Sequence, residues 1–68
     1  MRLTRLRAVR ERALLTQAEL AQRAGMSEAT ITRLERGRHD ARISTVRRLA
    51  EALHVEPEQL IGEENAPA

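Results

Sequence analysis

The 68-residue chain is long enough for one domain, and it contains no Cys, Phe, Trp or Tyr. It therefore has no disulfide, no cysteine-bound zinc and no aromatic platform for stacking single-stranded bases. Its net charge of +2 hides a division: the first 48 residues carry all 12 arginines and five acids, whereas the last 20 carry five acids and no Arg or Lys. No apolar run approaches the roughly 20 residues of a membrane span or forms a secretory signal, so we expect a cytoplasmic protein with no membrane partner.

Apolar residues spaced three and four positions apart predict a first helix over residues 2–13, followed by a turn at Leu14 and Leu15. A second helix is predicted to begin directly after Thr16. The Thr16 hydroxyl can accept a hydrogen bond from the Glu19 amide, and the Glu19 carboxylate can reach back to the Thr16 amide, which forms a capping box. The start of this helix is therefore specified by its own residues.

The second helix is predicted to end at Gly25, since glycine adopts the left-handed backbone of helix ends without steric cost. Ser27 is the expected N-cap of a third helix over about 28–36, with Ile31 facing inward and Gly37 as the stop. The sequence thus predicts two short amphipathic helices joined by a tight turn. Polar and basic side chains cover the outer face of the second of the pair.

A fourth helix is predicted from about Thr45, with Ser44 as its N-cap. Pro57 suits the first turn of a short fifth helix. Residues 62–68 are polar and are expected to form a disordered tail, which leaves one folded domain over 1–61.

The capped helix pair carries a motif that continues into the downstream helices. In the pair it comprises Thr16, Gln17, Glu19, Leu20, Ala21, Gly25, Ser27, Ile31, Leu34, Glu35 and Gly37. Downstream it comprises Ile43, Ser44, Thr45, Val46, Leu49, Ala50, Ala52, Leu53, Pro57 and Leu60. Over roughly residues 3–61 the chain resembles the Xre/Cro type of helix-turn-helix domain found in phage repressors and bacterial regulators. The resemblance implies an all-α, compact five-helix bundle whose third helix lies in the major groove of DNA.

The same resemblance implies which side chains meet DNA. Those facing the bases would be Ser27, Glu28, Ala29, Thr32 and Arg33. Those gripping phosphate would be Thr16, Gln17, Arg36 and Arg38. A phosphate at the start of the second helix also suits the exposed amides and positive dipole end found there. The family often ties its first helix to the recognition helix through an ion pair, at the positions of Arg10 and Glu35.

Four of the five base-facing positions have a simpler alternative. Arg33 is the strongest candidate, because arginine donating to guanine O6 and N7 is the commonest specific contact, but it could be a solvated arginine. Glu28 could accept a hydrogen bond from a cytosine amino group or merely favour the N-terminal end of its helix dipole, and both remain open. Ala29 and Thr32 could pack on a thymine methyl group, although small residues on a helix surface need no special role.

Three residues depart from the family pattern. Leu14 and His54 stand where the family commonly has glycine, and histidine tolerates a left-handed backbone better than most residues. We expect a strained or altered end of the first helix at Leu14. Ala41 stands where a loop proline is frequent, which favours a more mobile loop. None of the three lies on the expected DNA face.

The sequence predicts a double-stranded DNA-binding transcriptional regulator, a repressor that occupies a near-palindromic operator as a homodimer. Leu60 and Ile61 are the expected dimer surface, partly because the acidic C-terminal part is unsuited to DNA and partly by family analogy. The alternative is an antitoxin or adaptor module whose main role is to bind a toxin or another protein partner. With only His39, His54 and Asp40 as possible metal or triad members, no enzyme activity, cofactor or metal site is expected.

Overall fold

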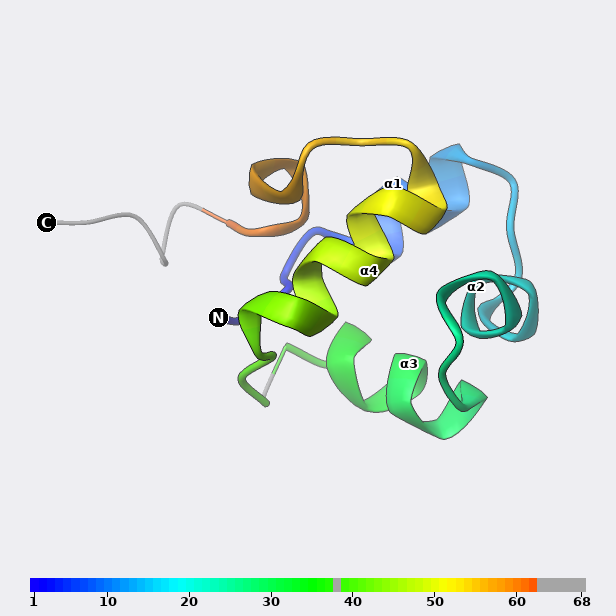
Figure 1. Cartoon of the computed structure of the whole chain (residues 1–68), viewed down its shortest axis with the longest axis horizontal. Coiled ribbons are helices and arrows are strands. Elements are labelled where there is room, and N and C mark those ends of the chain that lie inside the picture. The colour runs from blue at the N-terminus through cyan, green and yellow to red at the C-terminus, as the bar shows by residue number, and fades with distance from the viewer. Residues whose placement is uncertain (38, 63–68) are drawn as a thin grey trace, which may run out of the picture.

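Four α-helices and one 3-10 turn make up the helical structure of the computed structural model, which describes residues 1–37 and 39–62. They are α1 (Leu6–Arg12), α2 (Gln17–Ala24), α3 (Glu28–Glu35), α4 (Ile43–Leu53) and η1 (Pro57–Leu60). Helix α2 packs against α3 and α4, and η1 packs on α4 and α1 (Figure 1). The expected all-α class is confirmed, but the fifth element is a single 3-10 turn and not an α-helix. Of the tail expected over residues 62–68, residues 63–68 lie outside the described residues.

Local capping chemistry sets both ends of α2 and the start of α3, as predicted. The Thr16 hydroxyl accepts from the Glu19 amide at 3.0 Å, and the Thr16 amide donates to the Glu19 carboxylate at 2.9 Å. Gly25 ends α2 in the left-handed region, at φ 70°. The Ser27 hydroxyl accepts from the Thr30 amide at 3.1 Å, so the turn between the two helices is fixed from both sides.

The predicted first helix over 2–13 was wrong at its start, because α1 begins only at Leu6. The Met1 amino group donates to the Ala41 carbonyl at 3.0 Å, and the Ala41 amide donates back to Met1 at 2.6 Å. An isolated antiparallel bridge joins Arg2 to Asp40. This pairing holds the first residues extended beside the loop that precedes α4. Helical periodicity alone could not reveal a partner 40 residues away.

Helix α4 begins at Ile43, two residues before the predicted start, and Arg42 occupies the N-cap without a side-chain cap bond. Ser44 therefore lies in the first turn, and its predicted capping role was wrong. The preceding Ala41 is buried and hydrogen-bonded to Met1. The hydrogen bond between Ala41 and Met1 fixes the direction of the chain before α4, so the helix starts at Ile43 although serine is a preferred N-cap residue.

The two residues at glycine positions of the family both adopt left-handed backbone. Leu14 lies at φ 59° and His54 at φ 56°. The strain expected at the end of the first helix is therefore present, because an L-residue with a branched side chain is disfavoured in this region. Ala41 is buried against Met1, where it closes the paired segment.

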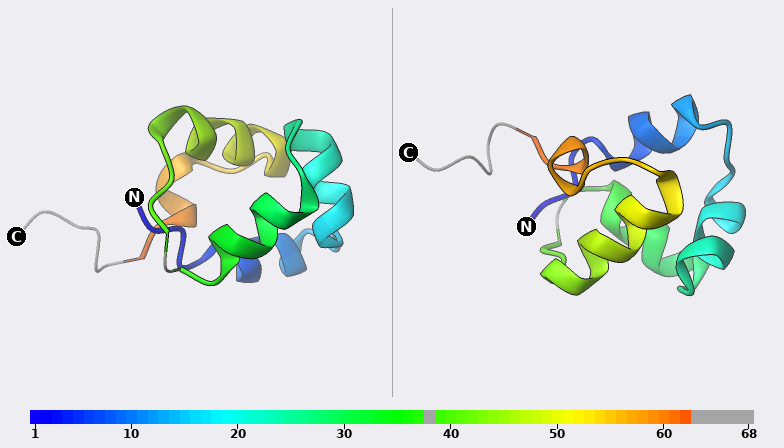
Figure 2. Two further views of the ribbon diagram at one scale, coloured as in Figure 1. Left: turned by 90° about the horizontal axis from the view of Figure 1, so that it is seen from below. Right: turned by 45° about the horizontal axis from the view of Figure 1, so that its top comes forward.

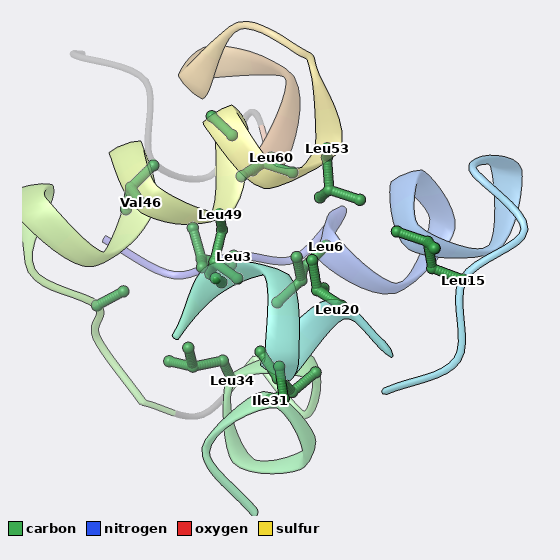
Figure 3. Close-up of a cluster of buried hydrophobic side chains, with 14 residues drawn as sticks. Leu3, Leu6, Leu15, Leu20, Ile31, Leu34, Val46, Leu49, Leu53 and Leu60 are labelled. Atoms are coloured by element: carbon green, nitrogen blue, oxygen red, sulfur yellow. The ribbon is translucent and has the colours of Figure 1, made fainter. Parts of the chain in front are cut away.

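The core is entirely aliphatic and draws on every element (Figure 3). Its largest fully buried side chains are Leu3, Leu6, Leu20, Ile31, Leu49 and Leu60. Leu60 is 0% exposed, so its side chain belongs to the protomer's own core and is not open to a partner, contrary to its expected place on a dimer surface. Ile61 is half-buried, and Gly62, expected to begin the tail, is buried.

In Figure 1, α4 lies between α3 and η1, whereas the left view of Figure 2 shows α3 and η1 both below α4. Arg33 and Arg36 lie on α3 and at its C-terminal end, whereas Glu56 and Glu58 lie at η1. The charge division along the sequence is only partly a spatial one, because Arg5 and Arg12 line a hollow beside Gln59 of η1. Among the described residues, no helix is long and apolar enough to cross a bilayer.

Candidate nucleic-acid interface

Helix α3 has one face in the core and one in solvent. Ile31 and Leu34 are buried, whereas Glu28, Ala29 and Arg33 are exposed. An open depression on the outer face is lined by Ala29, Thr32, Arg33, Arg36 and His39. The helix therefore presents a row of side chains to a partner while its other face fixes its position in the fold.

The five expected base-facing residues fall into two groups. The side chains of Glu28 and Arg33 make no hydrogen bond or ion pair with another described residue, and Ala29 has no polar group. By contrast, the Ser27 hydroxyl is taken up by the α3 cap. The Thr32 hydroxyl donates to the Gln17 side-chain oxygen at 2.9 Å, with the Glu28 carbonyl at 3.1 Å as a second acceptor.

Arg10 and Glu35, predicted as an ion pair, lie in direct contact between α1 and α3. Arg10 Nε donates to Glu35 Oε2 at 2.5 Å and Nη2 donates to Oε1 at 3.1 Å, which is a two-pronged arrangement. The side chains are only 11% and 5% exposed. The hydrogen bond to Glu35 raises the pKa of Arg10 above its ordinary value, so the guanidinium stays charged. Its Nη1 also donates to the Leu15 carbonyl at 2.8 Å, which joins the α1–α2 turn to the same pair.

The four residues expected to bind phosphate differ in their exposure and in whether the protein already uses their side chains. Thr16 is exposed, but its hydroxyl serves the α2 cap. Gln17 is half-buried, and its amide donates to Glu35 at 3.0 Å. Arg36 is exposed and has no side-chain partner among the described residues, whereas Arg38 lies outside them.

A hollow of about 370 Å³ lies where α1, the start of α2 and the end of α3 meet. It is lined by Arg7, Arg10, Gln17, Thr32, Glu35 and Arg36. The sequence gives Arg7 no role at this site, and only the packing of α1 beside α3 brings it to the hollow. Its side chain is 70% exposed and pairs with Glu11 at 3.7 Å, a contact of small energetic value at the surface.

Arg48 is a second residue that sequence reasoning missed. Its Nη2 donates to the Gly25 carbonyl at 2.8 Å, so α4 holds the turn between α2 and α3. A Cβ added at Gly25 would lie 2.7 Å from that nitrogen. No local pattern around Arg48 signals this contact, because its partner lies 23 residues away. Among the described residues, no group of three or more His, Cys, Asp or Glu could hold a metal ion.

Comparisons with known proteins agree with this geometry. A family model described as a helix-turn-helix domain matches residues 4–61. The chain is 35% identical over 60 residues to the immunity repressor protein of Bacillus phage phi105, covering 88% of this chain and 42% of the repressor. It is 38% identical over 66 residues to an uncharacterized HTH-type transcriptional regulator of Methanothermobacter thermautotrophicus, covering 93% and 96% of the two chains.

Among solved structures, the fold is similar to that of the restriction-modification controller protein C.AhdI from Aeromonas hydrophila. The TM-score is 0.80 at 33% sequence identity, over 85% of this chain and 88% of the controller. The chain thus spans less than half the length of the phage repressor but most of the controller and of the second relative.

Proposed function

The chain belongs to the helix-turn-helix family of DNA-binding transcriptional regulators, and we propose that it represses transcription by occupying one near-palindromic operator as a homodimer. The observation that carries this proposal is the outer face of α3. Arg33, Glu28 and Ala29 are exposed there without competing partners among the described residues, while Ile31 and Leu34 anchor the opposite face. An α-helix with such a face fits the major groove of B-form DNA.

In this proposal some side chains contact bases, some contact phosphate, and one ion pair only positions the recognition helix. Arg33 donates to a guanine, Glu28 faces the neighbouring base edges, and Arg36 contacts the phosphate backbone. Gln17 binds phosphate at the start of α2, where the amides of the first turn also point outward. The Arg10–Glu35 pair holds α3 at a fixed angle to α1, without touching DNA.

The homodimer follows from how such domains use two recognition helices. A two-fold pair places them about 34 Å apart on one side of the duplex, which matches a palindromic operator. We place the interface around half-buried Ile61 and the outer side of η1, because Leu60 is occupied by the core. The acidic Glu56 and Glu58 make this side unsuited to DNA and keep the arginines of α3 free for it.

The test is selection of binding sites from randomised duplex DNA, followed by affinity measurements on the enriched site and its single-base variants. We expect one palindrome to be enriched, and sedimentation of the complex to show two protein chains per site. Arg33→Ala should cost ~1–3 kcal/mol on that site and relax the preference at one base pair. Arg36→Ala is the matched control, one helical turn away on the same face, and it should weaken all sequences alike and reduce the salt dependence.

Enrichment without any shared sequence would contradict the proposal and favour a module that binds a protein partner. An equal loss of affinity on selected and random DNA for Arg33→Ala would reassign that residue to phosphate.

A further inference from the structure

The side-chain amide of Gln17 is held from both ends by α3. Its Nε2 donates to Glu35 Oε1 at 3.0 Å, and its Oε1 accepts from the Thr32 hydroxyl at 2.9 Å. The two partners lie 18 and 15 residues further along the chain. Because an amide group is planar, two such bonds fix both its position and the way its nitrogen and oxygen point.

The hydrogen bond to Gln17 suggests a role for the Thr32 hydroxyl other than contact with a base. A threonine hydroxyl has a single hydrogen, and here its acceptors are Gln17 Oε1 at 2.9 Å and the Glu28 carbonyl at 3.1 Å. Both acceptors are protein atoms, so the hydroxyl has no hydrogen left for a base. The half-buried side chain of Thr32 is also less accessible than that of Arg33, the next residue, which is exposed.

We propose that Thr32 is a positioning residue, whose hydroxyl holds the Gln17 amide ready for a backbone phosphate and does not read a base. This inference rests on the proposed DNA-binding function. It assigns to Thr32 a contribution to affinity that is the same for every sequence.

The residues that line the hollow beside Gln17 indicate which ligand the positioned amide would bind. Gln17 and Thr32 line it together with Arg7 and Arg36, whose side chains are exposed and positively charged. The negative charge of Glu35 is countered there by Arg10. The second hydrogen of Gln17 Nε2 is not used by Glu35 and remains available. A phosphate oxygen has the charge and the acceptor lone pairs that this set of donors requires.

The pre-organisation of the Gln17 side chain determines how much DNA affinity should be lost when the Thr32 hydrogen bond is removed. A free glutamine side chain must lose rotamer freedom when it binds phosphate, whereas the held one has lost it already. Removing the Thr32 bond should therefore weaken DNA binding about two- to tenfold. The loss should be uniform, since phosphate contacts carry no direct sequence information.

The experiment compares Thr32→Val with Thr32→Ser on a selected duplex and on its single-base variants. Thr32→Val keeps the shape and the methyl group but lacks the hydroxyl, so it should weaken every duplex by the same two- to tenfold factor. Thr32→Ser keeps the hydroxyl and should bind within about twofold of the parent. In a Gln17→Ala background, Thr32→Val should cause no further loss. A changed base preference in Thr32→Val, or its full effect in the Gln17→Ala background, would overturn the assignment.

A second readout needs no DNA. In the free protein, NMR relaxation of the Gln17 side-chain amide should report an ordered group in the parent and in Thr32→Ser, and a mobile one in Thr32→Val. An amide equally ordered in all three proteins would refute the positioning role even if DNA binding is normal. If the parent binds no duplex while Thr32→Val still frees the amide, the DNA function fails and the hydroxyl contact stands.

Discussion

Glu35→Ala is the substitution with the largest expected effect outside the aliphatic core. The Glu35 side chain is 5% exposed, and its carboxylate accepts hydrogen bonds from Arg10 Nε, Arg10 Nη2 and Gln17 Nε2. Alanine removes all three acceptor contacts at once. It leaves Arg10, whose side chain is 11% exposed in the parent, with the Leu15 carbonyl as its remaining hydrogen-bond partner among the described residues.

The burial of the pair sets the expected loss in the free energy of unfolding of Glu35→Ala. Removing one partner of a buried ion pair costs about 3–5 kcal/mol, because the other charge is left without compensation. We expect roughly 3 kcal/mol here, at the lower end, because the pair borders a hollow open to solvent. A domain of this length has a total stability of about 3–10 kcal/mol. The melting temperature should therefore fall by about 12–24 °C.

Thermal and urea unfolding followed by circular dichroism measures this loss. Glu11→Ala is the matched control, because it removes a glutamate that pairs with an arginine at the surface, where the side chains are 57% and 70% exposed. That change should cost less than about 1 kcal/mol. The double variant Arg10→Met with Glu35→Leu should recover at least half of the loss, since no charge is then left buried. DNA affinity of Glu35→Ala, measured well below its melting temperature, should also fall, because α3 loses its tie to α1.

Equal melting temperatures for Glu35→Ala and Glu11→Ala would refute the reasoning, because the buried pair would then contribute no more than a surface pair. A double variant as unstable as Glu35→Ala would refute the stranded-charge explanation and attribute the loss to packing.

Three further predictions concern the turns and caps. Leu14→Gly should stabilise the domain by ~0.5–1 kcal/mol in urea unfolding, because the leucine is 88% exposed and strained at φ 59°, whereas Leu14→Ala keeps the strain and should not. Gly25→Ala should destabilise by ~1–2 kcal/mol, since φ is 70° and the new Cβ meets Arg48 Nη2 at 2.7 Å, and an unchanged urea midpoint would contradict this. Hydrogen bonds from the backbone and hydroxyl of Thr16 hold the pKa of Glu19 below its ordinary value. The ionised carboxylate therefore stabilises the fold above about pH 4.3, and this contribution is lost as the pH falls through the lower folded-state pKa. The stability advantage of the parent over Glu19→Gln should accordingly shrink between pH 7 and pH 3, and a constant difference would exclude the linkage.

Features whose partners lie within one helical turn were predictable from the sequence alone. The Thr16–Glu19 capping box, the Ser27 cap and the left-handed Gly25 all follow from neighbouring residues, and each is present in the structure. The separation of arginines from the acidic end is likewise written in the sequence. The resemblance supplied the all-α class, and it placed Arg10 opposite Glu35, a contact that residue spacing alone does not reveal.

Only the tertiary structure decided the features that depend on distant partners. The first helix starts later than predicted because the first residues pair with Ala41 in an extended conformation. Leu60 is buried in the core and is not at the expected dimer surface, because η1 packs against α4. The same holds for Thr32, whose position on an outer helix face predicts a base contact. Its hydroxyl bonds to Gln17, 15 residues earlier, because α2 packs against α3. Caps and periodicity are local properties of a chain, whereas the partner of a polar side chain is chosen by packing.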